Sequence, residues 1–525
     1  MNKIDTGKFI NTRTRRKKYA TSFLMLLILT VLVVALAASC STKREAITSV
    51  DQLNEKGRVI GVAAETSEGK MVEKEFPNAK IEYYKGDMQA YLSVSQGKAD
   101  AFIFMKASLI TAVNNGLTGV RVLDETVGEP NRAAVAFSPK TKIPDLEDKV
   151  NRFLEEVKRD GTLDDMRKRW VVNQQYTMPD IDVPEKSDVH LVVGTTGLNM
   201  PFTFYTGSDL NGYDIELARR FAAWLGASLE FKVYDYDGII PAANSGDIDC
   251  IFANLFITPE RSEAIKFSEP TFIGEIGVLV RDDSTSNPIR SIKSSFEKTF
   301  ILENRYKLFA RGIGMTILIA FMSALCGTIC GFLLFMACRR GNPIANGAAS
   351  VFNWLMSGMP VVVLLMIMYY VVFASANISG ALVSIIAFTM TFGAEVYAMM
   401  KTAVGAVDSG QMEAAYALGY TDLKAFFRHI LPQAMPHFMP PFKSALINLI
   451  KATSIVGYIA VQDLTKAGDI IRSRTYEAFF PLIATAIIYF LLAGILVFAV
   501  NQIMKKLDPT KRREEDILKG VQIHD

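Results

Sequence analysis

Six long apolar runs alternate with polar segments along this 525-residue chain. Each is roughly 20 or more residues long, which is enough for a helix to cross a bilayer. They occupy residues 19–38, 312–337, 347–373, 379–400, 434–460 and 480–503. Between the first two runs, short apolar stretches alternate with amphipathic ones in a strand–helix–strand order. The pattern therefore predicts a multi-domain chain, with an α/β part followed by an all-α membrane part of about five helices.

Basic residues cluster beside the apolar runs. These clusters contain Arg13, Arg15, Arg16, Lys17 and Lys18 before the first run, Arg339 and Arg340 after the second, the segment 401–429 after the fourth, and the segment 505–513 after the last. If the runs alternate in direction, all four clusters lie on one side, which the positive-inside rule assigns to the cytoplasm. We therefore expect both termini in the cytoplasm and residues 41–300 outside the membrane.

Composition excludes several classes of function. Half of the residues are hydrophobic and the mean hydropathy is +0.21, which indicates a mixture of membrane and soluble parts. A net charge of +3 is small for this length, and the absence of a basic stripe argues against nucleic acid. The four histidines are dispersed, so no metal site is expected. Cys326, Cys330 and Cys338 share one apolar run and are interpreted as small hydrophobic residues, not as part of a disulfide framework.

A polar, helix-prone segment at 413–432 separates the fourth and fifth runs. Its alanines favour a short helix, Gly419 can adopt the positive φ that ends it, and Asp422 can begin a second helix. We expect two short helices at an angle, with small residues on one side and an aromatic patch on the other that needs covering. On this evidence, an interfacial helix without a partner is the alternative to a docking loop.

The same segment resembles the EAA motif in permease subunits of bacterial ABC importers. The matching positions are Glu413, Ala414, Ala415, Gly419, Leu431 and Pro432. The resemblance implies that residues 411–432 couple the permease to an ATPase subunit. It also implies a type I ABC transmembrane domain over residues 305–505, followed by a cytoplasmic tail at 506–525.

The exterior region divides into two α/β modules joined by a proline-bearing linker at 173–188. The module at 189–283, with its PFTFY and LNGYDIELARRF segments, resembles lobe one of periplasmic amino-acid-binding proteins. The module at 44–172 resembles lobe two, so the lobes look circularly permuted along the chain. We expect one two-lobed binding domain of the type II, Venus-flytrap kind. A linker at 284–304 would tether it to the permease.

A cleft between two lobes suits a small polar ligand, and Arg261 is the first candidate for its wall. The resemblance implies that Arg261 forks onto a ligand α-carboxylate, that Thr66 and Ser67 supply donors from the other lobe, and that Tyr236 lines the side-chain pocket. The other ligand-binding candidates carried over are Thr258, Asn254, Phe256, Phe202, Asn199 and Met105. The alternatives are a solvated Arg261 at a helix start, and Thr66 and Ser67 as helix caps.

Two positions depart from the family pattern. Met105 stands where the family has an aspartate for the ligand α-ammonium, and Asn199 stands where an aromatic ring often stacks on the ligand. Glu65 and Glu68 either replace the lost charge or are surface residues at a helix start. The predicted ligand is a small solute with a carboxylate. An amino acid is favoured because the permease half resembles the polar amino-acid, histidine/glutamine-type branch.

Cys40 and Glu395 each have two interpretations. Cys40 ends the segment LAASC, so residues 1–40 are either a lipoprotein-like signal with lipidation at Cys40 or an uncleaved signal anchor. Either would tether the binding domain to the outer face of the membrane. Glu395 lies inside an apolar run and is a candidate for the transmembrane pathway, unless it snorkels or pairs with Lys401.

The P-loop pattern GxxxxGK[ST] does not occur in the sequence. We therefore expect ATP hydrolysis, with ATP and Mg²⁺, on a separate ATPase chain, and no cofactor on this one. The chain is predicted to be a transporter subunit of the bacterial inner membrane and not an enzyme. Expected partners are ABC ATPase subunits, a second copy of the permease, a carboxylate ligand and membrane lipid. A ligand-gated ion channel and a membrane sensor with the same ligand domain are the alternatives.

Overall fold

A computed structural model describes residues 46–64, 68–84, 86–282, 292–374, 376, 378–477 and 479–507. All of the described helices and strands lie within Ser49–Asp525. The first apolar run, Cys40, Glu65, Thr66 and Ser67 lie outside the described residues.

The first lobe contains a five-stranded sheet. In spatial order its strands are β2 (Lys80–Tyr84), β1 (Val59–Ala63), β3 (Ala101–Met105), β13 (Ile276–Arg281) and β4 (Val120–Thr126). β1 runs parallel to β2 and β3, whereas β13 runs antiparallel to β3 and β4. The strands are connected by α2 (Glu68–Glu75), α3 (Asp87–Ser95) and α4 (Lys106–Asn114). β1 and β3 are buried at every position, which explains why their sequences are apolar throughout.

The second lobe contains another five-stranded sheet. Its strands, in spatial order, are β10 (Ser228–Val233), β6 (His190–Thr195), β11 (Cys250–Phe256), β5 (Asn131–Phe137) and β12 (Lys266–Gly274). β6 is parallel to β10 and β11, and β5 is antiparallel to β11 and β12. Its helices are α5 (Leu146–Arg159), α6 (Thr162–Arg167), α7 (Tyr213–Leu225), α8 (Tyr236–Ser245) and α9 (Pro259–Ala264). A small sheet of β7 (Leu198–Asn199), β8 (Thr203–Thr206) and β9 (Asp209–Asn211) accompanies them.

The chain crosses between the lobes twice. It passes from β4 in the first sheet to β5 in the second, and from β12 in the second sheet back to β13 in the first. Two crossings give the paired hinge of a two-lobed receptor. The lobes differ from the modules expected from chain order, because residues 131–172 belong to the second lobe: β5 enters its sheet, and α5 packs on β12 and α7. The expected boundary at residue 172 is therefore wrong as a boundary between lobes.

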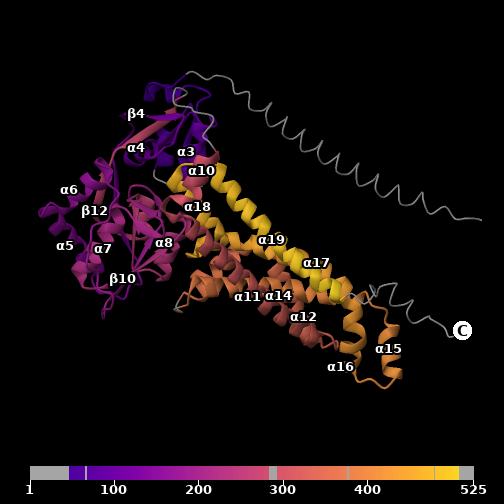
Figure 1. Cartoon of the computed structure of the whole chain (residues 1–525). Helices are drawn as coiled ribbons and strands as arrows, with labels where there is room; N and C mark the ends of the chain where they lie inside the picture. Colours follow the sequence, from indigo (N-terminus) through magenta and orange to yellow (C-terminus); the bar gives the residue numbers. More distant parts are fainter. Residues whose placement is uncertain are drawn as a thin grey trace, which may run out of the picture. The chain divides into compact units, whose positions relative to one another are not determined.

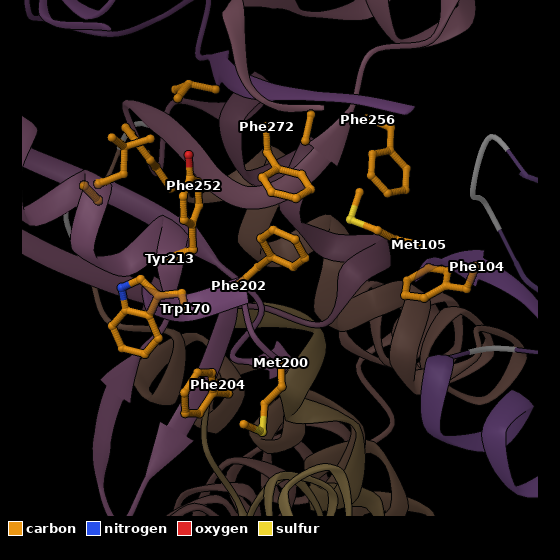
Figure 2. Close-up of a cluster of buried hydrophobic side chains, with 14 of the residues drawn as sticks. Phe104, Met105, Trp170, Met200, Phe202, Phe204, Tyr213, Phe252, Phe256 and Phe272 are labelled. Atoms are coloured by element: carbon orange, nitrogen blue, oxygen red, sulfur yellow. The ribbon is translucent and has the colours of Figure 1, made fainter. Parts of the chain in front are cut away.

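A buried aromatic cluster shows how the end of the first module packs on the second lobe (Figure 2). Trp170 is fully buried, and its Nε1 donates to Glu216 on α7 at 2.6 Å. Arg169 forks onto the same carboxylate at 2.7 and 3.0 Å. Phe202 lies edge-on to Phe272, with ring centroids 4.9 Å apart. These contacts fasten the segment before the 173–188 linker to the second lobe.

Among the described residues, three helices are long and apolar enough to cross a membrane, and up to five spans result if two bent pairs are counted. The three helices are α11 (Tyr306–Cys338), α14 (Gly380–Gly405) and α19 (Phe479–Leu507). They correspond to the expected runs at 312–337, 379–400 and 480–503. Figure 1 shows α11, α14, α17 (Leu431–Ala452) and α19 side by side, as their contacts require.

The runs at 347–373 and 434–460 are more complex than single helices. The first consists of α12 (Pro343–Gly358), α13 (Val361–Ile367) and η6 (Met368–Val372), with a bend of 108°. Pro360 causes the bend, because a proline disfavours helical backbone at the preceding residue, and Met359 is extended with φ −97° and ψ 128°. The expected run is therefore a bent pair of helices, which gives one of the up to five spans if the pair is counted as one. The second run continues through η8 (Thr453–Ile459) and then bends by 59° into α18 (Leu464–Thr475), a helix missing from the expected elements.

The segment expected as a linker at 284–304 is helical from residue 292 onward. It forms α10 (Ile292–Phe296), η4 (Glu297–Ile301) and η5 (Leu302–Asn304). Phe300 packs between Phe296 and Phe309, with ring centroids 5.0 and 5.1 Å away. A freely flexible tether over 292–304 is therefore ruled out, because its apolar side chains pack against the start of α11.

The polar segment after α14 forms the expected helix, turn and second helix. α15 (Gly410–Ala417) ends before Gly419, which has φ +81°, and α16 (Asp422–Ala425) follows. The second helix is not short, because it continues through η7 (Phe426–Ile430) into α17. Figure 1 shows α15 and α16 at the end of α17.

Candidate functional site

A cavity of 410 Å³ lies where the two lobes meet the helical part. The first lobe contributes the end of β1 and α3, the second lobe α8 and β11, and the helical part η8 and α18. Its charged and amide-bearing wall residues are Asp87, Gln89, Asn199, Asp235, Asp237, Asn254, Asp469 and Arg472. This volume and mixed wall are typical of a small-molecule site.

Asn254 lies on the cavity wall in a left-handed backbone conformation, with φ 50°. Its backbone N–H donates to the carboxylate of Asp214 on α7, which stabilises this uncommon geometry. Asn254 is 5% exposed, and its Nδ2 donates to Met105 Sδ at 3.7 Å. Its Oδ1 has no hydrogen-bond partner in the described part of the chain. A buried acceptor of this kind favours a ligand that brings a donor.

Asp214 is itself a buried carboxyl group, 3% exposed. Burial raises its pKa to about 7, although the Asn254 N–H stabilises the ionised form. The residue thus links the start of α7 to the backbone that presents Asn254.

Arg261 lies on α9, but its contacts are with protein groups beside the cavity. Its two terminal nitrogens donate to the Phe256 carbonyl at 3.1 Å and to the Tyr236 hydroxyl at 2.8 Å. The guanidinium also lies over the Tyr236 ring, 5.5 Å from its centroid. Thr258 is the N-cap of α9 and accepts from the Arg261 backbone N–H at 3.2 Å. Both Tyr236 and Phe256 line the cavity, so Arg261 contacts two residues of its wall.

The remaining sequence candidates lie at different depths. Asn199 lines the cavity, and its Oδ1 accepts from Ser108 of the first lobe at 2.9 Å. Met105 is fully buried and touches Asn254, whereas Phe202 belongs to the aromatic core of the second lobe. Thr66 and Ser67 are outside the described residues, so their predicted role stays a prediction.

Two carboxylates of the first lobe lie close to this site. Glu68 is fully buried and accepts from Asn131 Nδ2 at 2.8 Å, so it is not a surface residue at a helix start. Asp87, the first residue of α3, lies on the cavity wall. The residue is half-buried by area. Burial first, and then the nearby Glu68 charge, raise the pKa of Asp87 to about 7. Asp87 was not among the candidates from the sequence, because the position where the family has an aspartate is Met105 in this chain.

The helical part contributes residues that the sequence did not indicate. On α18, Asp469 and Arg472 form an ion pair of 3.0 Å at the cavity wall. Lys466, 3% exposed, reaches the second lobe and donates to Asp235 at 2.6 Å. Tyr476 contacts the Tyr91 ring of the first lobe, with centroids 5.9 Å apart. α18 was missed because it is too polar and short for a membrane span, although Asp463 is a recognisable N-cap.

The coupling residues form a second surface at the other end of the helical part. Glu413, Ala414, Gly419 and Pro432 are exposed, Leu431 is half-buried, and Ala415 is 3% exposed. Apolar side chains on the same loop are also exposed, namely Tyr416, Leu418, Leu423 and Phe427. Such a patch is typical of a protein-binding surface.

Arg339, after α11, attaches this loop to the helices. Its guanidinium forks onto Asp422 and lies 4.7 Å from the ring centroid of Phe426, which is fully buried. Arg340 and the Tyr416 hydroxyl contact the same carboxylate at 3.3 and 3.0 Å. The Arg339 hydrogen bond first, and the other partners with it, lower the pKa of Asp422 despite partial burial. A rearrangement of the loop is thereby linked to α11.

Glu395 lies on α14 between buried neighbours, but its own side chain is exposed. It forms no ion pair with Lys401 or with any other described residue. The alternative in which Glu395 pairs with Lys401 is therefore not supported, because Lys401 lies six positions along the helix, on a different face.

Comparison with known proteins gives two kinds of match. Residues 191–510 match the family model described as bacterial extracellular solute-binding proteins, family 3. The chain is also 30% identical to the probable amino-acid ABC transporter permease protein YckA of Bacillus subtilis, over 37% of this chain and 87% of that protein. It is 30% identical to the putative glutamine transport system permease protein GlnP of Rickettsia bellii, over 40% of this chain and 98% of that protein. A crystal structure of an amino acid ABC transporter with histidines is 27% identical and covers 42% of this chain and 99% of that one, with a TM-score of 0.37.

Proposed function

The chain belongs to family 3 of the bacterial extracellular solute-binding proteins and to the amino-acid permeases of ABC transporters, and we propose that it captures an amino acid outside the cell and passes it across the inner membrane. Receptor and permease are thus parts of one subunit of an ATP-driven importer. The observation that carries the proposal is the cavity, whose wall is made by both lobes and by the helical part. A ligand held there is already beside the helices that must conduct it. The family matches favour this function over an ion channel or a sensor.

The lobes are joined across the cavity by contacts that a ligand would reinforce. Ser108 donates to Asn199 at 2.9 Å, and Asn254 donates to Met105. On the surface, Lys70 of α2 forms an ion pair with Glu260 of α9. With hinge crossings after β4 and β12, these contacts fit a receptor that closes over its ligand.

The second lobe, in turn, is fastened to the helical part. Besides the Lys466–Asp235 pair, Tyr370 donates to the Gly238 carbonyl at 3.1 Å, and Tyr369 donates to Asp247. These contacts support direct transfer within one chain, so that diffusion of a separate binding protein is unnecessary.

ATP and Mg²⁺ would be bound by a partner ATPase on the cytoplasmic side, with no cofactor on this chain. The exposed apolar side chains of the coupling loop support such a docking partner, and Arg339–Asp422 would transmit its movement to α11. Both termini are then cytoplasmic unless Cys40 is cleaved and lipidated.

A second copy of the chain would complete the pathway. An exposed carboxylate within an apolar helix is costly against lipid, so Glu395 favours a polar path between two permeases. Exposed apolar residues of α12 and η6, such as Trp354 and Val371, offer further surface for a partner or for lipid.

Uptake by proteoliposomes tests the proposal. The full chain, copurified with its ATPase, should accumulate a radiolabelled amino acid only when ATP is present on the ATPase side. Glu413→Ala should abolish uptake and copurification, whereas Glu155→Ala, at an exposed position of α5, should change neither. ATP-independent ligand-gated currents through the same chain would contradict the proposal.

A further inference from the structure

The cavity wall carries more negative than positive charge. Four aspartates line it, at positions 87, 235, 237 and 469, whereas Arg472 is its one basic lining residue within the described chain. Lys466 adds a positive charge from behind the wall, through Asp235. Asp469 is likewise paired with Arg472. Asp87 forms no ion pair with any residue that the structure describes.

Aromatic rings from three parts of the protein line the same cavity as Asp87. Tyr91 follows it by one turn of α3, Tyr236 comes from the second lobe and Tyr476 from the helical part, and all three line the cavity. Burial raises the pKa of Tyr91 and of Tyr236, and the negative charge of Asp87 adds to both shifts. The carboxylate is thus within electrostatic range of both rings. A carboxylate beside aromatic faces is an arrangement that attracts organic cations.

Asn254 supplies an independent indication of the ligand. Its buried Oδ1 lacks a hydrogen-bond partner within the described chain, whereas its Nδ2 is already in contact with Met105. Only a donor satisfies a carbonyl oxygen. An ammonium or guanidinium group brings several N–H donors, whereas a second ligand carboxylate would face both this oxygen and the aspartates.

The described wall offers one basic side chain, Arg472, to a ligand carboxylate. Arg472 is paired with Asp469 through one terminal nitrogen, and its buried Nε has no hydrogen-bond partner among the described residues. Arg261, expected to hold a ligand carboxylate, already donates to Phe256 and Tyr236. The wall therefore suits a single carboxylate, near Arg472, and an excess of positive charge elsewhere.

We propose that the cavity selects amino acids of net positive charge, with the basic side chain held by Asp87 among Tyr91, Tyr236 and Tyr476, and with Asn254 Oδ1 accepting from a ligand N–H. The inference rests on the proposed function and specifies its substrate class. Removal of the Asp87 charge should weaken binding of a basic ligand, while a neutral ligand of the same shape should be little affected.

Equilibrium binding to the full chain in nanodiscs tests this selectivity. The probes are lysine, norleucine as its uncharged analogue of similar length, and glutamate. Lysine should bind about tenfold or more tightly than norleucine or glutamate, the ratio expected from one charge-assisted hydrogen bond. Asp87→Asn should remove most of this ratio. Asp124→Asn, at an exposed aspartate of β4 in the same lobe, should leave it unchanged.

Asp87→Glu separates loss of charge from loss of folding. It retains the carboxylate and should preserve a preference for lysine over norleucine, even if both bind less tightly. Tighter binding of norleucine or glutamate than of lysine would overturn the charge selectivity but leave the importer proposal standing. Unchanged lysine affinity in Asp87→Asn would also overturn the charge selectivity and leave the importer proposal standing. If no amino acid of any charge binds, both this inference and the proposed function are wrong.

Discussion

Lys466 and Asp235 provide a quantitative test of the contact between receptor and permease. The Lys466 side chain is 3% exposed and the Asp235 side chain 30% exposed, and their charged groups are 2.6 Å apart. Removal of one partner from a buried ion pair costs about 3–5 kcal/mol when the remaining charge stays buried. The two single substitutions should therefore have unequal effects, because only one of the remaining charges reaches water.

Asp235→Asn leaves the Lys466 ammonium buried without a counter-ion, and we expect a loss of about 3 kcal/mol in the free energy of unfolding. Lys466→Met leaves Asp235 partly hydrated, so we expect about 1–2 kcal/mol. The double variant should be more stable than Asp235→Asn alone, because no buried charge is left unpaired. Thermal unfolding of the full chain in nanodiscs measures this order as a difference in Tm.

The exposed pair Lys80–Glu82 serves as the control, since its side chains are 69% and 34% exposed. Lys80→Met should shift Tm little, because water and salt screen the attraction between exposed charges. Equal effects of Asp235→Asn and Lys466→Met, or a double variant as destabilised as the sum of the two, would refute the reasoning.

Three further substitutions have defined outcomes. Gly331→Ala on α11 would place a Cβ 2.4 Å from the Gly393 carbonyl oxygen of α14, so it should lower the free energy of unfolding by about 1–3 kcal/mol. Gly314→Ala is the control, because a Cβ there has no atom within 4 Å, and it should leave Tm unchanged or raise it in the same assay. In Gly419→Ala the added Cβ would have no atom within 4 Å, but the residue must keep φ +81°, which costs about 1–2 kcal/mol of backbone strain. This strain in the coupling loop should reduce stimulation of the ATPase, which a coupled ATPase assay measures. Asp214 has a folded-state pKa of about 7, above its usual value of 3.8, so its contribution to stability is full below pH 3.8 and is lost as the pH rises towards 7. Between pH 5 and pH 8, the Tm of Asp214→Asn should therefore fall by less than the Tm of the unsubstituted chain. An equal fall in both proteins would contradict the raised pKa of Asp214.

Local patterns in the sequence determined much of the fold correctly. The uninterrupted apolar sequences of β1, β3 and β11 correctly indicate fully buried strands. In the coupling loop, the alanines indicate the first helix, Gly419 the turn and Asp422 the start of the second helix. These features depend on residues close together in the chain. The division into lobes was not predicted correctly, because β5 and β13 each join a sheet made mainly by the other module. Such pairing is set by contacts between residues more than a hundred positions apart.

The candidate site was less predictable for the same reason. Arg261, Tyr236 and Asn254 were found by resemblance, but only the structure shows that Arg261 donates to Tyr236. Asp87 and Arg472 are ordinary charged helix residues in the sequence. Their significance comes from the meeting of α3, α8 and α18 around one cavity, which no local pattern contains.

The permuted chain order attaches the two lobes to the helical part differently. The second lobe makes hydrogen bonds and ion pairs with it, at Asp235, Asp247 and Tyr205. The first lobe meets it through the rings of Tyr91 and Tyr476, which slide more easily than a buried ion pair breaks. Opening at the hinges should therefore move the first lobe, with Asp87, while the second lobe stays on α18. As the first lobe moves Asp87 away from the cavity, the cationic group of a ligand would be released first. The carboxylate of the ligand would stay beside Arg472, on the side of the permease.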